Sequence, residues 1–507
     1  MTQLPLLPVL VPLAAAVLQL AFHRSGIRLA RVIGLASAGL VALLAVALLL
    51  ATGEGAVFAV ALGNWPAPFG IVFVADQLAA TMVAVTAAVA LPALIAATDG
   101  TDARGRHFHP IFQLQIAGLN GAFLTGDLFN LFVFFEVLLI ASYVLLAHGG
   151  GPRRSRAAMH YVVLNLAGSL LFLIGLGLLY GTMGTLNIAD LAGRVAALPA
   201  ESVAPARAAF ALLLAVFAFT AALLPLGFWL PHAYASAAAP VAALFAVLTK
   251  VGIYAMLRLS TAVFPAADWT AGLLSPWLMP AALGTILAGT IGVLAARRLG
   301  VMVAHLLLLS TGMLAVAVAE GSPRMLAATV YYLPHTTLVT AALFLLVGRI
   351  AAARGTAEDR IVHAARPEAW AMLGSAWLVL GIAVTGLPPL SGFIGKVMLL
   401  AAAPASPTGS AIWAVFILSG FVGALAMARA GSVVFWEPRD HPLPASTGVP
   451  TLGLALVLAL GFVPLLVFGA APLSAHAAAV AAQISARTAY VGGVLPGPAP
   501  VVRERRP

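Results

Sequence analysis

The sequence predicts an all-α integral membrane protein with about fourteen transmembrane helices, and three observations support this prediction. Hydrophobic residues make up 62% of the chain and charged residues only 8%, and the mean hydropathy is +1.07. Apolar runs of about 20 residues recur along the chain, and this length crosses a hydrocarbon core about 30 Å thick. Arginine-rich loops alternate with arginine-poor loops between the runs. Together these features exclude a soluble domain.

The apolar runs place the expected helices. The first run has no basic residue before it, so we expect a spanning helix rather than a cleaved signal. The predicted spans lie near residues 4–22, 28–52, 71–98, 108–126, 128–148, 157–181, 206–230, 239–258, 273–296, 300–319, 325–348, 370–402, 411–430 and 450–469.

Loop charge predicts the orientation and excludes several kinds of partner. The positive-inside rule puts the arginine-rich loops in the cytoplasm and both termini outside it. The net charge of +10 is scattered between spans without one basic face, so we expect a lipid bilayer and not nucleic acid as its partner. The chain has no cysteine, which excludes disulfides and iron–sulfur clusters. No histidine pair has metal-ligand spacing with a carboxylate, so we expect no metal and no cofactor.

Two predicted spans contain proline in their interior. Pro225 interrupts span seven and Pro388 interrupts span twelve. Interior proline removes a backbone hydrogen bond and clashes with the preceding turn. In a bilayer the freed carbonyls must face protein or water, so we expect broken helices at both places.

The order of the spans predicts an internal repeat. The broken spans are the fourth members of two five-helix blocks, residues 108–258 and 273–430, flanked by a three-helix segment (1–100) and a last helix with a tail (450–507). An odd number of helices per block inverts one block relative to the other. Broken helices at corresponding places in inverted halves indicate a transport site near the midplane.

The chain has only two lysines, Lys250 and Lys396, and both lie inside apolar stretches. An ionisable residue within a membrane span is costly, so each is a candidate functional residue. Lysine can release its proton when buried, whereas the charge of arginine is effectively permanent. The alternatives are snorkelling to the interface for Lys250 and the capping of freed carbonyls for Lys396.

Glu136 lies well inside span five and is the candidate proton-accepting carboxylate. The alternative is a protonated residue that packs helices together through a hydrogen bond. His305 and His335 fall within spans ten and eleven, and each is either a proton relay between the lysines or a satisfied interior histidine. His232 follows Pro231 and either gates water access or lies at the surface.

Several long motifs resemble the D-type subunit of the Mrp/Pha-type multisubunit monovalent cation/proton antiporters, over essentially the whole chain. The superfamily also includes antiporter-like proton-pumping subunits of respiratory complex I and of membrane-bound hydrogenases. The motifs are GAFLTGDLFNLFVFFE at 121–136, FWLP at 228–231, LTKVGIY at 248–254, GLPPLSGFIGK at 386–396, and ARAGS at 428–432 followed by Phe435 and Trp436.

The resemblance implies fourteen helices, two inverted five-helix repeats and a chain of buried charges along the midplane. It also implies residence in the bacterial cell membrane, assembly with other membrane subunits, and exchange of Na⁺ or K⁺ for protons. In this hypothesis Glu136 loads protons, Lys250 is the central relay, and His305 and His335 carry the path to Lys396. The broken helices at Pro225 and Pro388, with His232, would gate or couple transport.

One departure from the family pattern affects the first half. The family has a lysine before the first break, where this chain has Thr220. The expected ion partner of Glu136 is therefore missing. Two hypotheses remain: Thr220 holds water that relays protons towards Lys250, or this half-channel is weakened and the subunit is largely structural or regulatory.

The predicted function is that of a transporter subunit and not an enzyme: a proton-translocating chain of a monovalent cation/proton antiporter. The alternative is a pumping subunit of an NADH-quinone oxidoreductase or hydrogenase, with redox chemistry in partner chains. A third hypothesis is a scaffold that does not transport.

Overall fold

Three long helices and a β-hairpin form the N-terminal part of the computed structural model, which describes residues 3–364, 369–437 and 453–495. The antiparallel strands β1 (Phe58–Ala61) and β2 (Val72–Ala75) precede the third helix, so the span expected from residue 71 begins as a strand. The carboxylate of Asp76 then caps this helix by accepting a hydrogen bond from the Ala79 N–H (2.9 Å). The helices are α1 (Leu7–Ala21), α2 (Ile27–Thr52) and α3 (Gln77–Ala97).

The next part of the chain contains the first predicted five-helix block. Asp127 caps α5 by accepting a hydrogen bond from the Asn130 N–H (2.9 Å). The span predicted over 239–258 divides into two helices at Ala246 and Val247. The helices are α4 (Phe108–Leu124), α5 (Leu128–Ala147), α6 (Pro152–Met183), α7 (Ile188–Ala196), α8 (Val203–Thr220), α9 (Trp229–Ser236), α10 (Ala239–Phe245) and α11 (Leu248–Arg258).

The second predicted block follows a π-helical turn at Leu259–Val263 and two 3-10 turns. Its helices are α12 (Ser275–Ala295), α13 (Leu299–Glu320), α14 (Pro323–Ala353), α15 (Trp370–Thr385), α16 (Ser391–Ala402) and α17 (Pro407–Gly431). The C-terminal part contains α18 (Gly453–Phe468), α19 (Ala470–Ser485) and α20 (Arg487–Val494).

The helices have the length and composition of a multi-pass membrane protein. Within the described ranges, eleven helices are long and apolar enough to cross a membrane, or twelve if α18 and α19, bent by 79°, form one span. The helix α4 is 17 residues long, and span twelve is divided into the shorter α15 and α16. The helical membrane fold is therefore confirmed apart from the β-hairpin, while the count of fourteen spans and the inverted repeat stay predictions.

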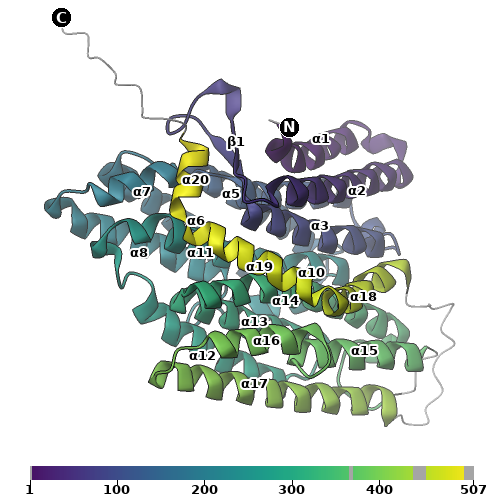
Figure 1. The fold of residues 1–507 in the computed structure, drawn as a ribbon. Helices are drawn as coiled ribbons and strands as arrows, with labels where there is room; N and C mark the ends of the chain where they lie inside the picture. Colours follow the sequence, from purple (N-terminus) through teal and green to yellow (C-terminus); the bar gives the residue numbers. More distant parts are fainter. Residues whose placement is uncertain (1–2, 365–368, 438–452, 496–507) are drawn as a thin grey trace, which may run out of the picture.

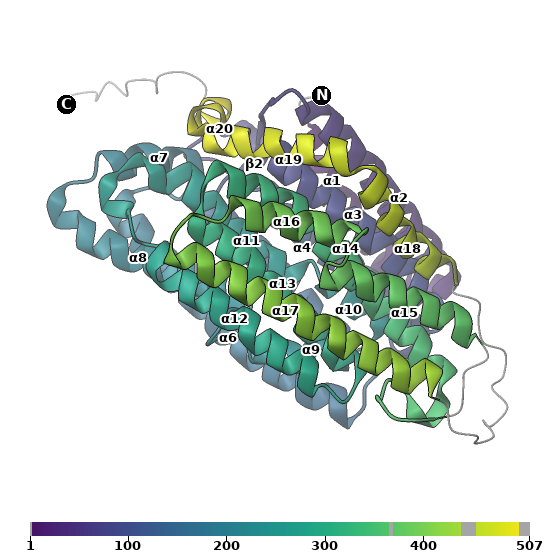
Figure 2. The same cartoon turned by 60° about the horizontal axis from the view of Figure 1, so that its bottom comes forward.

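The core is centred on α14, which packs against α3, α10, α13, α16 and α19 (Figures 1 and 2). The helical segment Ala239–Ala266, which includes α10 and α11, is buried throughout its most apolar window. By contrast, α2, α6 and α17 lie at the periphery and expose apolar side chains such as Leu43, Leu170 and Phe421. Any charged group on α11 therefore lies in the interior of the protein and away from lipid.

Candidate functional site

The first interrupted helix breaks where the sequence predicts. The helix α8 ends at Thr220 and α9 begins at Trp229, with a cis bond between Leu224 and Pro225 in the turn. The Leu224 N–H donates to the hydroxyl of Thr285 on α12 (2.8 Å), and the Trp229 indole N–H donates to the Phe219 carbonyl (3.2 Å). Neutral protein groups thus form hydrogen bonds with backbone atoms at the break, which an apolar environment could not provide.

Thr220 ends the first half-helix and is buried. Its hydroxyl donates to the Val216 carbonyl of its own helix (2.9 Å). Gly252 allows α11 to lie directly against this end of α8, because a Cβ at that position would be 2.4 Å from the Phe217 carbonyl oxygen. Across the described ranges, no hydrogen bond joins Thr220 to Glu136 or Lys250.

Glu136 lies in the middle of α5 and is partly exposed. The hydroxyl of Ser169 on α6 donates a hydrogen bond to its Oε1 atom. No ion pair in the described parts of the chain includes Glu136. The neighbouring Gly168 lies against the ring of Phe219, so α6 connects the glutamate to the first break.

Lys250 is completely buried, as expected for a mid-span lysine. Among the described residues, its Nζ atom has one hydrogen-bond partner, the Thr249 hydroxyl at 3.3 Å. An ammonium group has three donors, so this lysine is incompletely satisfied when charged. It follows the α10–α11 junction, where the Val247 N–H donates to the Leu244 carbonyl (3.1 Å) in place of the regular α-helical bond.

The second interrupted helix brings two predicted site residues together. The helix α15 ends at Thr385 and α16 begins at Ser391, with the cis Pro388–Pro389 bond between them. The Lys396 Nζ atom donates to the Thr385 carbonyl (2.6 Å), which is the capping contact considered as its structural role. The His335 Nδ1 atom and the Ser391 hydroxyl are 2.9 Å apart. A lysine and a histidine thus both contact the ends of this break.

The other two histidines lie elsewhere. His305 is partly buried on α13, and its Nδ1 atom bonds with the Val301 carbonyl (2.9 Å) while its ring lies against Gly292 of α12. His232 is exposed on α9. Within the described ranges, no hydrogen bond joins His305 or His232 to either lysine. The histidine relay through His305 therefore stays a prediction without a direct contact.

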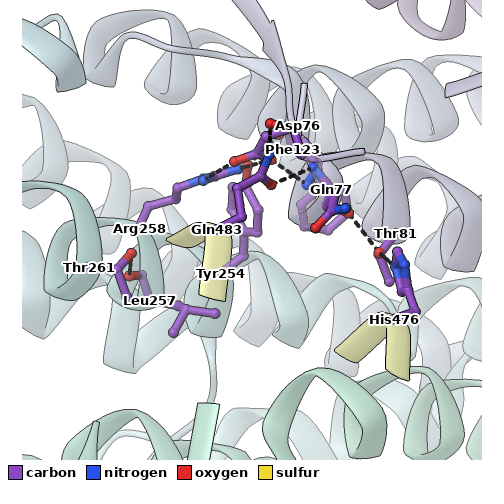
Figure 3. Close-up of polar contacts among 12 residues, drawn as sticks. Asp76, Gln77, Thr81, Phe123, Tyr254, Leu257, Arg258, Thr261, His476 and Gln483 are labelled. Carbon is purple, nitrogen blue, oxygen red and sulfur yellow. Dashed lines mark hydrogen bonds and ion pairs between the residues drawn. The ribbon is translucent and has the colours of Figure 1, made fainter. Parts of the chain in front are cut away.

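Sequence reasoning missed a buried ion pair at the far end of α11. The guanidinium of Arg258 donates two hydrogen bonds of 2.5 Å each to the carboxylate of Asp76 (Figure 3). Its Nε atom donates to the Tyr254 hydroxyl (3.0 Å), which donates to the Phe123 carbonyl (2.5 Å). The four-residue spacing of Tyr254 and Arg258 places them on one face of α11 and indicates their contact, but it gives no sign of Asp76.

A cavity of about 730 Å³ lies beside α9, α10 and α14, at the end of the molecule that carries the arginine-rich loops. Tyr234 lines it, and among the described residues its buried hydroxyl has no hydrogen-bond partner. The Tyr234 ring lies 5.3 Å from that of Phe245, the last residue of α10. The cavity lining also includes Asp99, Arg104, Arg153, Arg154, Arg298, Arg349, Glu358 and Asp359.

Comparisons with known proteins agree with this architecture. A family model described as "NADH:quinone oxidoreductase/Mrp antiporter, TM" matches residues 125–423. The probable D-type subunit of a K⁺/H⁺ antiporter of Rhizobium meliloti is 44% identical over 87% of this chain and 88% of its own length. The D-type subunit of a Na⁺/H⁺ antiporter of Alkalihalophilus pseudofirmus is 35% identical over 98% of this chain and 100% of its own length. A chain of the Mrp complex from Dietzia sp. DQ12-45-1b is 30% identical and superposes with a TM-score of 0.86 over 98% of this chain and 100% of that chain.

Proposed function

Because this chain belongs to the NADH:quinone oxidoreductase/Mrp antiporter family and is similar to D-type antiporter subunits, we propose that it carries protons through a multisubunit antiporter that exchanges Na⁺ or K⁺ for protons. The observation that supports this function most strongly is the fully buried Lys250 on α11, the helix that packs against the end of the first interrupted helix. An unpaired ionisable group in such an apolar interior is costly, so its retention indicates a function.

The proposed path uses residues from both halves. Glu136 on α5 accepts a proton, and Lys250 on α11 passes it on. His335 and Lys396 then carry it through the second break, where both already contact the ends of the interrupted helix. His305 is a secondary candidate for the step between Lys250 and His335. The cavity lined by Tyr234 supports water access from the side of the arginine-rich loops.

The proposed setting is a bacterial cell membrane with the arginine-rich loops in the cytoplasm and both termini outside. The proposed partners are the other membrane subunits of the complex. The multisubunit Mrp complex that contains the similar solved chain supports this assembly.

Antiport by the whole complex tests the function. The complex is expressed in a host without other antiporters, and inverted membrane vesicles are acidified inside by respiration in the presence of a pH-sensitive dye. Addition of Na⁺ or K⁺ should release protons from the vesicles, and vesicles whose complex lacks this subunit should not respond. Proton movement that requires NADH or hydrogen and ignores both cations would assign the chain to a redox-driven complex.

A further inference from the structure

The C-terminal helices α19 and α20 form an arm that crosses the molecule towards α11. After the 79° bend that follows α18, α19 packs along α14, and α20 contacts α7, β1 and the π-helical turn after α11 (Figure 1). The arm therefore connects α14, in the second half of the chain, to the turn at the C-terminal end of α11, the helix that carries Lys250.

Polar side chains fix the arm to α3 (Figure 3) and to the loop that follows α2. The His476 Nε2 atom lies 2.9 Å from the Thr81 hydroxyl. The Gln483 side chain accepts a hydrogen bond from the Gln77 N–H (3.0 Å) and donates one to the Gly55 carbonyl (2.8 Å). The Gln77 N–H is one of the donors that a helix start leaves free, so Gln483 caps α3 beside Asp76.

Tyr490 carries the contact from the arm to the buried ion pair. The guanidinium carbon of Arg258 lies 5.1 Å from the centre of the Tyr490 ring and 5.0 Å from that of Tyr254. A cation over an aromatic face is stabilised, and more so when water is excluded. Arg258, Asp76 and Tyr490 are each at most 5% exposed. The arm thus closes one side of the Asp76–Arg258 pair.

The helix α11 packs against α8 and α13, and the Asp76–Arg258 pair with Tyr490 anchors its C-terminal end. It has only 11 residues, and it is irregular at both ends, with the α10–α11 junction before it and the π-helical turn Leu259–Val263 behind it. Such irregular turns weaken the continuity of a helix with its neighbours. Lys250 lies two turns from Arg258, about 12 Å along the helix axis. A shift of the Arg258 anchor is therefore carried directly to Lys250.

We propose that the C-terminal arm, through Tyr490 and Gln483, holds the Asp76–Arg258 pair and thereby sets the position of Lys250 in the proton path. The role of Lys250 rests on the proposed function, but the placement of α11 by the arm does not. Asp76, Arg258 and Tyr490 are positioning residues. Displacement of a reacting group by about 1 Å can cost about 100-fold in rate, so partial loosening of the anchor is expected to cost about 10-fold.

Substitutions at Tyr490 test the proposal in the whole complex. Tyr490→Leu should lower the antiport rate per assembled complex about 10-fold and change its pH profile, because the contact with Arg258 is lost. Tyr490→Phe keeps the ring and loses only a hydroxyl that has no partner among the described residues, so it should restore most of the rate. Thr488→Leu, at an exposed position of the same helix, is the matched control.

A purely structural arm gives a different result. Tyr490→Leu would then lower the amount of assembled complex and leave the rate per complex and the pH profile unchanged, which would overturn the proposal. If Tyr490→Leu prevents assembly, Gln483→Leu provides the same comparison from the other anchor of the arm.

Thiol labelling separates the proposal from the proposed function. The natural chain has no cysteine, so Lys250→Cys introduces its single thiol. Because position 250 is completely buried, a membrane-permeant maleimide can label this thiol only when the packing around α11 opens. The labelling rate in the assembled complex should therefore rise when Tyr490→Leu is added, whether or not the complex performs antiport. An unchanged labelling rate would refute the control of α11 by the arm.

Discussion

The two interrupted helices differ in the groups that satisfy their freed backbone atoms. At the first break these groups are neutral, namely the Trp229 indole and the Thr285 hydroxyl. At the second break the Lys396 ammonium donates directly to the Thr385 carbonyl, and His335 contacts Ser391. Ionisable groups therefore contact the ends of the second break. In the first half, the ionisable groups Glu136 and Lys250 bond with Ser169 and Thr249 and, among the described residues, do not bond with the ends of the break.

Thr220 contributes to this difference. The resemblance leads us to expect a lysine at the end of α8, and Thr220 occupies that position with its hydroxyl bonded to its own helix. Glu136 is left with Ser169, and Lys250 with Thr249, so neither has a charged partner among the described residues. We infer that proton transfer in the first half depends on water between these groups, whereas the second half offers direct side-chain contacts.

The largest effect is expected at Lys250. Lys250→Ala removes the central relay and should lower antiport by about 100-fold or more without preventing assembly, because a positioned acid or base contributes about 10²–10⁴ in rate. Antiport in inverted vesicles and growth in high salt measure this loss. Salt tolerance retained by the variant would reject Lys250 as the relay.

Lys396 distinguishes proton transfer from capping. Lys396→Arg can still donate to the Thr385 carbonyl but does not release its proton. We expect antiport to fall about 10- to 100-fold in both Lys396→Arg and Lys396→Met. Near-normal antiport in Lys396→Arg together with loss in Lys396→Met would show that the lysine acts only as a cap, and the second half would then resemble the first.

Thr220 tests whether a neutral break can support transfer. Thr220→Val keeps the shape of the side chain but removes the oxygen that could bind water, so we expect a fall in antiport of about 10-fold, while Thr220→Ser should stay close to the unmodified complex. An unaffected Thr220→Val complex would instead favour the weakened half-channel. Thr220→Lys introduces the lysine that the family has at this position. The change in antiport in this variant measures how far the missing charge limits transport.

The smallest effect concerns stability at the loop between α3 and α4. The buried carboxylate of Asp102 accepts hydrogen bonds from Arg31 (2.7 and 2.9 Å) and lies 2.9 Å from the His109 Nε2 atom. Burial alone would raise the pKa of Asp102, but the bonds from Arg31 and His109 outweigh it and hold the pKa below its ordinary value of 3.8. A pKa that is lower in the folded state adds stability above the unfolded value, and this stability is lost as the pH falls through the folded value.

Asp102→Asn should therefore destabilise the folded complex at pH 7 by about 1–2 kcal/mol. This value allows for solvent screening of the ion pair, because Arg31 is partly exposed. The difference in Tm between the unmodified complex and the variant should shrink as the pH falls below about 4. A Tm difference that stays constant with pH would show that the lost charge is not its cause. Antiport per complex should not change, because Asp102 lies outside the proposed path.

The sequence predicts features that depend on local chemistry. Proline inside an apolar span predicted both breaks, because it removes a backbone hydrogen bond and clashes with the preceding turn. Proline alone does not decide a break, since α1, α3, α12, α14 and α18 each continue through an interior proline. The scarcity of lysine singled out Lys250 and Lys396, and both are buried. These properties are visible without knowledge of the neighbouring helices.

Features that depend on distant partners were missed. Arg258 stands at the end of the predicted span 239–258, and nothing in the nearby sequence indicates its partner Asp76, which lies 182 residues away. The junction between α10 and α11 falls at Ala246 and Val247, where no proline or glycine marks it. The arm formed by α19 and α20 is stabilised by contacts with α14 and α3. Its alanine-rich sequence does not predict these contacts.

Antiport by a complex with Glu136→Gln tests the central claim most directly, because that claim is that the first half carries protons although its break has no charged group. The substitution keeps the size of the side chain and the acceptor for the Ser169 hydroxyl, and it removes only the ability to take up and release a proton. The account predicts that antiport per assembled complex in inverted vesicles falls about 10-fold or more. Antiport at the unmodified rate would contradict it and leave this chain as a scaffold in its first half.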